Sequence, residues 1–199
     1  MTELVVATQN QGKMREIRDL LKEFDLKITS IADYPDAPEI IEDGETFADN
    51  AVKKAVALAR HTGKLAMGED SGLEVTALDN RPGVYSARFA GEEATDETNN
   101  AKLLELLKDV PASRRQARYR CCAALVQGDK TLTMVEGSCS GLITTEARGT
   151  NGFGYDPLFL IEEHDKTFGE LDLSVKAQMS HRARAMDKVK AFLTSYLNR

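Results

Sequence analysis

Residues 4–24 of the chain, LVVATQNQGKMREIRDLLKEF, decide how the fold begins. Residues 4–7 form an apolar run that is too short for a helix, so they favour a strand, and the polar residues 8–12 after them favour a turn. After Lys13 apolar side chains recur at helical spacing and charged residues fill the opposite face; the apolar positions are Met14, Ile17, Leu20, Leu21 and Phe24. A strand, a turn and a helix are therefore expected to open the protein.

Helix and strand patterns alternate along the rest of the chain. Thr46 with Asp49 resembles an N-cap, and a second amphipathic helix is expected after it, with an apolar face at Ala51, Val52, Ala55, Leu58 and Ala59. The other expected elements are a strand over 26–31, a short strand ending near Met67, an acidic turn over 68–72, a strand over 73–77, a helix capped at Thr95 and Asp96 that runs through Leu107, a hairpin of strands 118–126 and 131–137 joined at Gly128-Asp129, a short strand over 158–161 and a closing helix over 183–196. This order predicts an α/β fold with a mixed sheet. Because the polar segments fall at strand edges, a ligand is expected in a cleft beside them.

Composition and charge limit the classes of function. A chain of 199 residues, 42% of them hydrophobic, can form one domain or two lobes that share a sheet. The net charge of -6 makes long tracts of DNA or RNA poor partners but leaves room for a small anionic substrate. The cysteines, Cys121, Cys122 and Cys139, are expected to be buried, inert thiols. No secretory signal is recognised and no apolar run approaches the roughly 20 residues that span a bilayer, so we expect a cytoplasmic protein that does not enter membranes.

The first polar segment has the chemistry of a phosphate-binding turn. It joins the expected strand to the expected helix, so backbone N–H groups, a hydroxyl, amides and an ammonium meet at the start of a helix; its residues are Thr8, Gln9, Asn10, Gln11, Gly12 and Lys13. It is not a Walker loop, because the first glycine is missing and Met14 stands where a hydroxyl residue would hold Mg²⁺. The alternative is an ordinary loop before a solvated lysine.

Two acidic segments have the chemistry of a magnesium site. They are Glu42-Asp43-Gly44 and Glu69-Asp70-Ser71-Gly72. Carboxylates beside glycines can hold Mg²⁺ through few protein oxygens while the metal keeps waters and substrate phosphates. One carboxylate could also accept a proton from an attacking water. The alternative is that these acids are solvated turn residues or helix caps.

Two segments near the carboxyl end could recognise a planar base. Asn151-Gly152-Phe153-Gly154-Tyr155-Asp156-Pro157 is a glycine-flanked loop that could expose the Phe153 ring for stacking. Lys176 and Ser180-His181-Arg182 gather donors near the start of the last helix. In the alternative, the rings pack into the core, Ser180 caps the helix, and His181 and Arg182 are solvated.

Taken together, these segments resemble the inosine triphosphate pyrophosphatase family of non-canonical purine nucleoside triphosphate pyrophosphatases. The resemblance runs nearly end to end and in family order. It rests on Thr8-Gln9-Asn10-Gln11-Gly12-Lys13, Thr46-Phe47-Ala48-Asp49-Asn50-Ala51, Glu69-Asp70-Ser71-Gly72-Leu73, Pro82-Gly83-Val84-Tyr85-Ser86-Ala87-Arg88, Gly152-Phe153-Gly154-Tyr155-Asp156-Pro157 and Ser180-His181-Arg182.

The resemblance implies a fold, an activity and a metal. Residues 1–199 would form a single domain, an elongated two-lobed α/β subunit with a long mixed β-sheet flanked by helices, an active-site cleft between the lobes and a homodimeric assembly. The enzyme would hydrolyse ITP, dITP and XTP with Mg²⁺ to the monophosphate and pyrophosphate, which keeps these bases out of DNA and RNA. Two rival functions are a sensor that binds triphosphates without cleaving them, and a kinase or GTPase that transfers or releases a single phosphate.

The resemblance also implies roles for individual residues. Asp70 would be the catalytic carboxylate, and Glu42 with Asp70 would bind Mg²⁺. Substrate contacts would come from the triphosphate-gripping residues Thr8, Gln9, Asn10, Gln11, Gly12 and Lys13, from Ser71, from the base-stacking segment Phe153, Gly154, Tyr155 and Asp156, and from Lys176, His181 and Arg182 at the purine edge. This chain departs from the family where Gln9 replaces the usual glycine and Gly68-Glu69 replaces the usual Ala-Asp pair. Whether Glu69 contacts the metal directly, through water or not at all is therefore left open.

Overall fold

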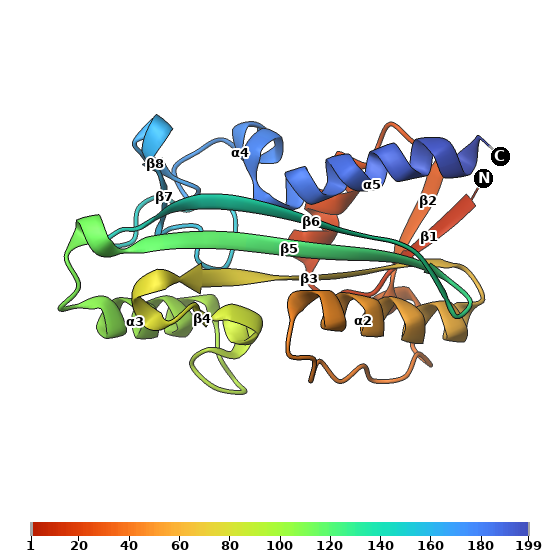
Figure 1. The fold of residues 1–199 in the computed structure, drawn as a ribbon, viewed down its shortest axis with the longest axis horizontal. Helices are drawn as coiled ribbons and strands as arrows, with labels where there is room; N and C mark the ends of the chain where they lie inside the picture. Colours follow the sequence, from red (N-terminus) through yellow and green to blue (C-terminus); the bar gives the residue numbers. More distant parts are fainter. Residues whose placement is uncertain (1, 199) are drawn as a thin grey trace. The chain divides into compact units, whose positions relative to one another are not determined.

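The structure, a computed structural model, describes residues 2–198 and centres on a mixed β-sheet (Figure 1). Within these residues the sheet has eight strands: β1 (Thr2–Val6), β2 (Leu26–Ser30), β3 (Leu65–Val75), β4 (Arg81–Pro82), β5 (Gln116–Gln127), β6 (Lys130–Ile143), β7 (Phe159–Ile161) and β8 (Lys166–Thr167). Their order is β2-β1-β3-β5-β6-β7-β8, and β4 pairs with β3. β1 is parallel to β2 and β3, whereas β7 is antiparallel to β6 and β8. The predicted mixed α/β fold is confirmed.

The α-helices flank the sheet. They are α1 (Gln11–Leu20), α2 (Phe47–Thr62), α3 (Asp96–Leu107), α4 (Leu173–Met179) and α5 (His181–Leu197), and short 3-10 turns lie between them at Ile31–Asp33, Thr76–Leu78, Gly83–Arg88, Ala112–Arg114 and Glu162–His164. α2 and α3 begin at the predicted caps, because the hydroxyls of Thr46 and Thr95 accept the backbone N–H three residues on. No helix among residues 2–198 combines the length and apolar character needed to cross a bilayer.

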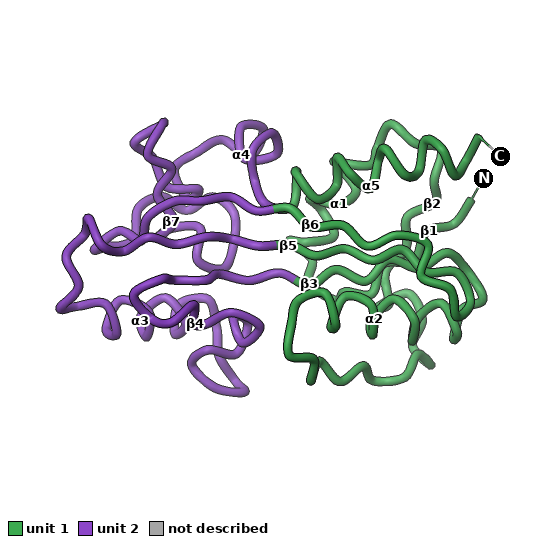
Figure 2. The backbone as a smooth tube through the Cα atoms, viewed as in Figure 1, with its two compact units in different colours: residues 1–70, 121–137, 182–199 green, residues 71–120, 138–181 purple. Residues whose placement is uncertain are grey.

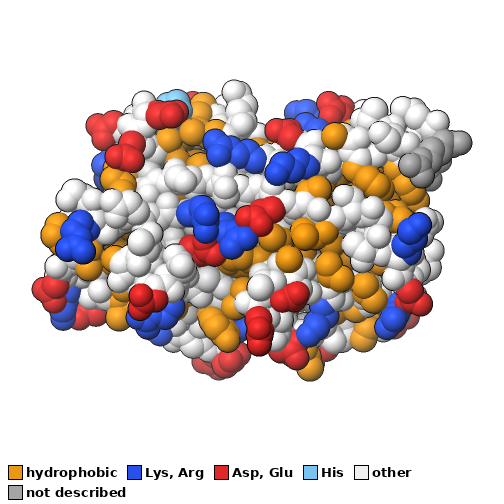
Figure 3. Space-filling view, viewed as in Figure 1, with side chains coloured by type: hydrophobic (Ala, Val, Ile, Leu, Met, Phe, Trp, Pro, Cys, Tyr) orange, Lys and Arg blue, Asp and Glu red, His pale blue; other side chains and the backbone are white. Residues whose placement is uncertain are grey.

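The chain divides into two compact units, coloured in Figure 2. Unit 1 holds Met1–Asp70, Cys121–Gly137 and Arg182–Arg199, and unit 2 holds Ser71–Arg120 and Ser138–His181. On the face that Figure 3 draws, Lys and Arg side chains are interspersed with Asp and Glu. No extended basic area lies on that face, as expected for a chain of net charge -6.

The core of unit 1 is a helix-sheet-helix sandwich. Alternate residues of β1, β3 and β5 pack against α1 and α5 on one face of the sheet; they are Leu4, Val6, Leu65, Met67, Cys121, Ala123 and Leu125, facing Met14, Ile17, Leu21, Ala185, Met186, Val189 and Leu193. The other face carries α2 (Figure 1). A side chain at Gly68 would lie 1.9 Å from the carbonyl oxygen of Ala51. The backbones of β3 and α2 therefore touch at Gly68.

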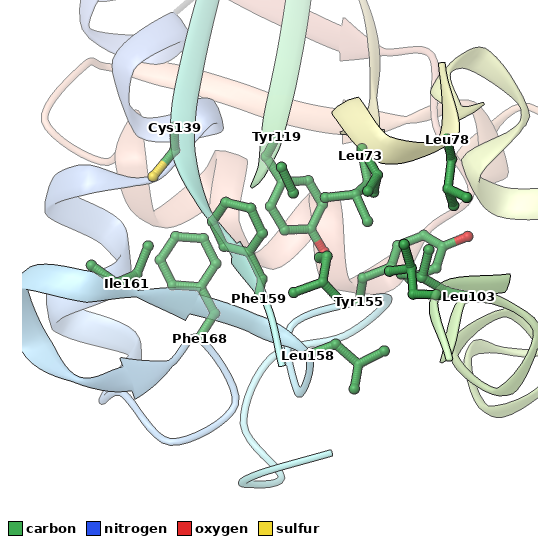
Figure 4. Packing of buried hydrophobic residues seen from close by; sticks show 14 of the residues in the cluster. Leu73, Leu78, Leu103, Tyr119, Cys139, Tyr155, Leu158, Phe159, Ile161 and Phe168 are labelled. Atoms are coloured by element: carbon green, nitrogen blue, oxygen red, sulfur yellow. The ribbon is translucent and has the colours of Figure 1, made fainter. Parts of the chain in front are cut away.

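Unit 2 has an aromatic core of its own (Figure 4). The ring of Tyr119 lies 4.7 Å from that of Phe159, and Phe159 lies 5.2 Å from Phe168. Leu103 and Leu107 of α3 close this cluster from one side. The three cysteines are free and buried in the described structure, as predicted.

Two sequence predictions were wrong in detail. The acidic turn expected at 68–72 does not exist, because β3 runs without interruption from Leu65 to Val75. Its glycine marks the close approach to α2 rather than a turn. The first helix begins at Gln11 instead of after Lys13, because the side chain of Asn10 caps it, and it ends at Leu20 before Phe24.

Candidate functional site

The amino-terminal polar segment forms the start of α1. The Asn10 side chain accepts the backbone N–H of Lys13 at 3.0 Å, and the Asn10 N–H donates to the Thr8 hydroxyl at 3.2 Å. Gln11, Gly12 and Lys13 therefore occupy the first helical turn, where backbone N–H groups lack carbonyl partners within the helix. Gln9, Asn10 and Gln11 are exposed. Such an exposed helix start suits an anion.

Asp70 lies on the α2 face of β3, just beyond the end of the neighbouring strand. β1 pairs with β3 only as far as Met67, so the next residues of β3 have no β1 partner. The Asn50 amide donates to Asp70 Oδ2 at 3.1 Å, and the Lys54 ammonium donates to Asp70 Oδ1 at 3.0 Å. Asn50 and Lys54 are four residues apart and share one face of α2. The helix therefore holds the Asp70 carboxylate by two fixed donors.

Glu42 joins this group through the same ammonium. Lys54 Nζ lies 2.8 Å from Glu42 Oε2, so one cation bridges the carboxylates of Glu42 and Asp70. The loop that carries Glu42 is tied to α2, because the Gly44 N–H donates to the Asn50 side-chain oxygen at 2.8 Å. Glu42 and Asp70, predicted together from separate segments, are thus brought together.

Burial and charge separate the two carboxylates electrostatically. Burial raises the pKa of Asp70 above its usual value, although the charges of Lys54 and Lys13 act to lower it. The negative charge of Glu42 raises this pKa further. Burial also acts to raise the pKa of Glu42, but the Lys54 ammonium, together with Lys13 and Asp70, holds that pKa below its usual range. Lys13 exerts its charge on both groups, so the start of α1 and Asp70 lie within electrostatic reach of each other. A buried carboxylate of raised pKa is the better proton acceptor of the two.

Glu69 lies on the opposite face of β3 from Asp70, because successive strand residues alternate. The Arg182 guanidinium and the Cys121 thiol donate to Glu69 Oε1 at 3.0 Å and 3.1 Å. The Lys13 ammonium lies 2.9 Å from Glu69 Oε2. Burial acts to raise the pKa of Glu69, but Arg182 and Lys13 hold it well below the usual range. Glu69 is therefore an ionised group held between two cations.

In unit 2, the Asp156 side chain makes the contacts that hold the glycine-flanked loop 151–157, which carries Phe153. Its Oδ2 accepts the Phe153 N–H at 2.9 Å and the Lys176 ammonium at 2.6 Å. Lys176 Nζ lies 4.8 Å from the centre of the Phe153 ring, which is partly exposed. Gly152 has a φ of +78°, and a side chain there would lie 1.9 Å from Asp156 Oδ2. The loop thus presents a ring beside a buried cation.

The neighbours of this loop are fixed by contacts within unit 2. The buried Tyr155 donates its hydroxyl to the Ser86 carbonyl at 2.8 Å, so its ring belongs to the core. The Gly154 N–H donates to Asp96 at 2.6 Å, and its carbonyl accepts from Asn100 at 2.9 Å. The His181 ring stacks on Tyr119 with centroids 4.6 Å apart.

The predicted site residues divide between the two units. Unit 1 brings together the α1 start with Lys13, Glu42, Asp70 and also Arg182, which pairs with Glu16 and Glu69. Unit 2 holds Ser71, Phe153, Gly154, Tyr155, Asp156, Lys176 and His181. Sequence reasoning missed Lys54 and Asn50. Their signal is present, because these polar residues fall beside Ala51 and Ala55 on the buried face of α2.

The acidic side chains of unit 1 provide two carboxylates, which is enough for a hard divalent cation that needs few protein ligands. Residues 2–198 contain no group of three or more His, Cys, Asp or Glu side chains placed to hold a metal. Glu42 and Asp70 offer two carboxylates that already share one cation. A cation that takes few protein oxygens and completes its shell with waters and phosphate oxygens suits such a pair.

Comparisons with known proteins cover nearly the whole chain. The family model described as "Ham1 family" matches residues 4–192. A protein named dITP/XTP pyrophosphatase from Desulforamulus reducens is 52% identical over 190 residues, which are 96% of this chain and 94% of the relative. One of the same name from Geobacter sulfurreducens is 51% identical and covers 97% of each chain. The solved structure of a HAM1 protein from Coxiella burnetii is similar with a TM-score of 0.89 at 39% identity, covering 98% of this chain and 100% of that one.

Proposed function

The chain belongs to the Ham1 family, and from that premise we propose that it hydrolyses dITP, XTP and ITP to the monophosphate and pyrophosphate, clearing these nucleotides before they enter DNA and RNA. The names of the relatives support this substrate class. The observation that carries the proposal is the group in unit 1 in which the start of α1, Asp70 and the Lys54-bridged Glu42 lie within electrostatic reach of one another.

Asp70 is the proposed proton acceptor. A water attacks the α-phosphorus, a new P–O bond forms, the bond from that phosphorus to the bridging oxygen breaks, and the water proton passes to the Asp70 carboxylate. Pyrophosphate leaves with the bond electrons. The pKa of Asp70, raised by burial, favours this role, while Asn50 and Lys54 hold the carboxylate oriented.

The start of α1 is the proposed triphosphate grip. Lys13 and the N–H groups of Gln11 and Gly12 provide positive charge and donors where the phosphates would lie. Thr8 and Asn10 shape that turn, Gln9 is exposed within it as a further proposed substrate contact, and Ser71 follows Asp70 along β3.

We also propose Mg²⁺ as the metal, held by Glu42 and Asp70, where it would neutralise phosphate charge. The cytoplasmic location and the homodimer stay predictions of the sequence.

Base recognition is proposed for the unit 2 loop. The partly exposed Phe153 ring would stack on the purine, and Lys176, His181 or Arg182 would donate to O6 of hypoxanthine or xanthine. Adenine carries a donor at that position, and the mismatch costs about 10- to 100-fold. It stays a prediction that the chain forms a single domain with one cleft, in which the same nucleotide contacts Lys13 and the segment Phe153, Gly154, Tyr155 and Asp156.

Initial rates of pyrophosphate release from dITP, XTP, ITP, GTP and ATP with Mg²⁺ test the proposal. We expect the first three to be preferred, and Asp70→Asn to lower kcat by at least about 100-fold. Asp129→Asn, in the exposed β5–β6 turn, is the matched control and should be unchanged. Orthophosphate as the first product would favour a kinase or GTPase, and binding without any release would favour a sensor.

A further inference from the structure

Glu69 is a buried acid for which the proposed chemistry has no use. Its side chain is fully buried, and it points to the face of β3 that packs on α1 and α5. Asp70, the proposed proton acceptor, points to the other face. A role for Glu69 must therefore come from the groups that it contacts.

Each carboxylate oxygen of Glu69 meets a different cation. Oε1 accepts from the Arg182 guanidinium at 3.0 Å, and Oε2 lies 2.9 Å from the Lys13 ammonium. Glu69 thus joins the lysine of the proposed triphosphate grip to the first turn of α5. Both contacts lie within unit 1.

The two ends of this bridge differ in freedom. The Arg182 side chain is 2% exposed and also pairs with Glu16 of α1, so its guanidinium is fixed from both sides. The Lys13 side chain is 17% exposed, which makes it the end that reaches solvent. Lysine has a long, flexible side chain, so its ammonium stays in one place only if another group anchors it.

We propose that Glu69 is a positioning residue, whose carboxylate, fixed by Arg182, holds the Lys13 ammonium ready for the phosphate chain before substrate arrives. The inference rests on the proposed function for the meaning of Lys13. A preplaced cation lowers the ordering cost of binding, so loss of the anchor acts mainly on substrate affinity.

Three variants test the proposal. Glu69→Gln keeps the shape and removes the charge, whereas Glu69→Asp keeps the charge and shortens the side chain by one methylene. Glu74→Gln is the matched control, because Glu74 is a second β3 glutamate, 12% exposed and paired with Arg118 and Arg120 in unit 2.

Glu69→Gln should raise KM for dITP about 10-fold and change kcat by less than about 3-fold. Glu69→Asp should return KM to within about 3-fold of wild type, and Glu74→Gln should leave it unchanged. In a Lys13→Ala background, Glu69→Gln should add less than about 2-fold, because the two residues act as one unit. An unchanged KM in Glu69→Gln, or a full additional loss in the Lys13→Ala background, would overturn the proposal.

A second readout does not depend on turnover. An amine-acylating reagent labels Lys13, and mass spectrometry of the peptide measures the labelling rate. This rate should rise at least about 3-fold in Glu69→Gln and should reach an intermediate level in Glu69→Asp. In Glu74→Gln it should not rise. A wild-type rate in both Glu69 variants overturns the anchor, and if Glu69→Gln does not fold, Glu69→Asp alone decides. Failure of the wild type to release pyrophosphate contradicts the proposed function, while the labelling still decides the role of Glu69.

Discussion

Replacing Lys54 by Met removes the cation that bridges Glu42 and Asp70 and leaves the apolar part of the side chain nearly unchanged. The Lys54 side chain is 6% exposed, that of Asp70 is 8% and that of Glu42 is 39%. Without Lys54, the buried Asp70 loses its charged donor and keeps the neutral Asn50 amide. The substitution therefore isolates the contribution of one ammonium.

The expected loss follows from these exposures. The buried Lys54–Asp70 contact contributes about 2 kcal/mol, as hydrogen bonds to charged groups do. The Lys54–Glu42 contact adds at most about 1 kcal/mol, because more than a third of Glu42 is exposed and water screens it. Protonation of Asp70, whose pKa burial already raises, limits the cost. A loss of up to about 3 kcal/mol corresponds to a melting temperature lower by up to about 10 °C for a chain of this size.

Thermal unfolding of Lys54→Met beside Lys53→Met at pH 7 measures this loss. Lys53 is the matched control, because it is the neighbouring residue of α2 and pairs with Asp43 at the surface. We expect Lys53→Met to melt within about 2 °C of wild type. Equal melting temperatures for the two variants would refute the bridging role of Lys54.

Three further predictions follow from the same structure. Gly68→Ala should lower the free energy of unfolding by about 1–3 kcal/mol in urea titrations, because its side chain would meet Ala51 O at 1.9 Å. Gly128→Ala is the control for backbone strain alone, because its φ is +59° but no atom lies within 4 Å of the added carbon, and it should lose less. Gly152→Ala should lower kcat/KM for dITP about 10-fold in steady-state assays, since it displaces Asp156; wild-type kinetics would contradict this. Glu3→Gln should destabilise the protein at neutral pH, because hydrogen bonds hold the pKa of Glu3 at about 2 instead of 4.5. The melting temperatures of variant and wild type should converge as the pH falls from about 4.5 to about 2. A difference that stays constant over this range would refute the prediction.

The sequence predicted those parts of the fold that depend on local signals. The capping box of Thr46 and Asp49 lies within one helical turn, and the structure starts α2 there. The residues between strands 118–126 and 131–137 predicted the β5–β6 hairpin in the same way, although both strands are longer than expected. α4 has only seven residues, too few for a helical repeat of apolar positions to stand out.

The site was predicted less completely, because its assembly depends on contacts distant in sequence. Glu42 and Asp70 were grouped from a family resemblance, whereas the ammonium that joins them comes from α2. The neighbours of Lys54 in α2 mark its side of the helix as buried, but its pairing with Asp70 and Glu42 depends on the register of α2 against β3, which no pattern within the helix states.

The pair Glu69-Asp70 illustrates why a cluster of acids in a sequence differs from a cluster in space. As a turn, 68–72 would let both carboxylates approach one metal ion. As part of β3, it sends them to opposite faces, Asp70 toward Lys54 and Glu69 toward Arg182. The two acids are thereby separated by the sheet and each is matched with its own cations, which lowers the cost of burying two adjacent carboxyl groups. Gly68 makes this arrangement possible, since any side chain there would push α2, and Lys54 with it, away from Asp70.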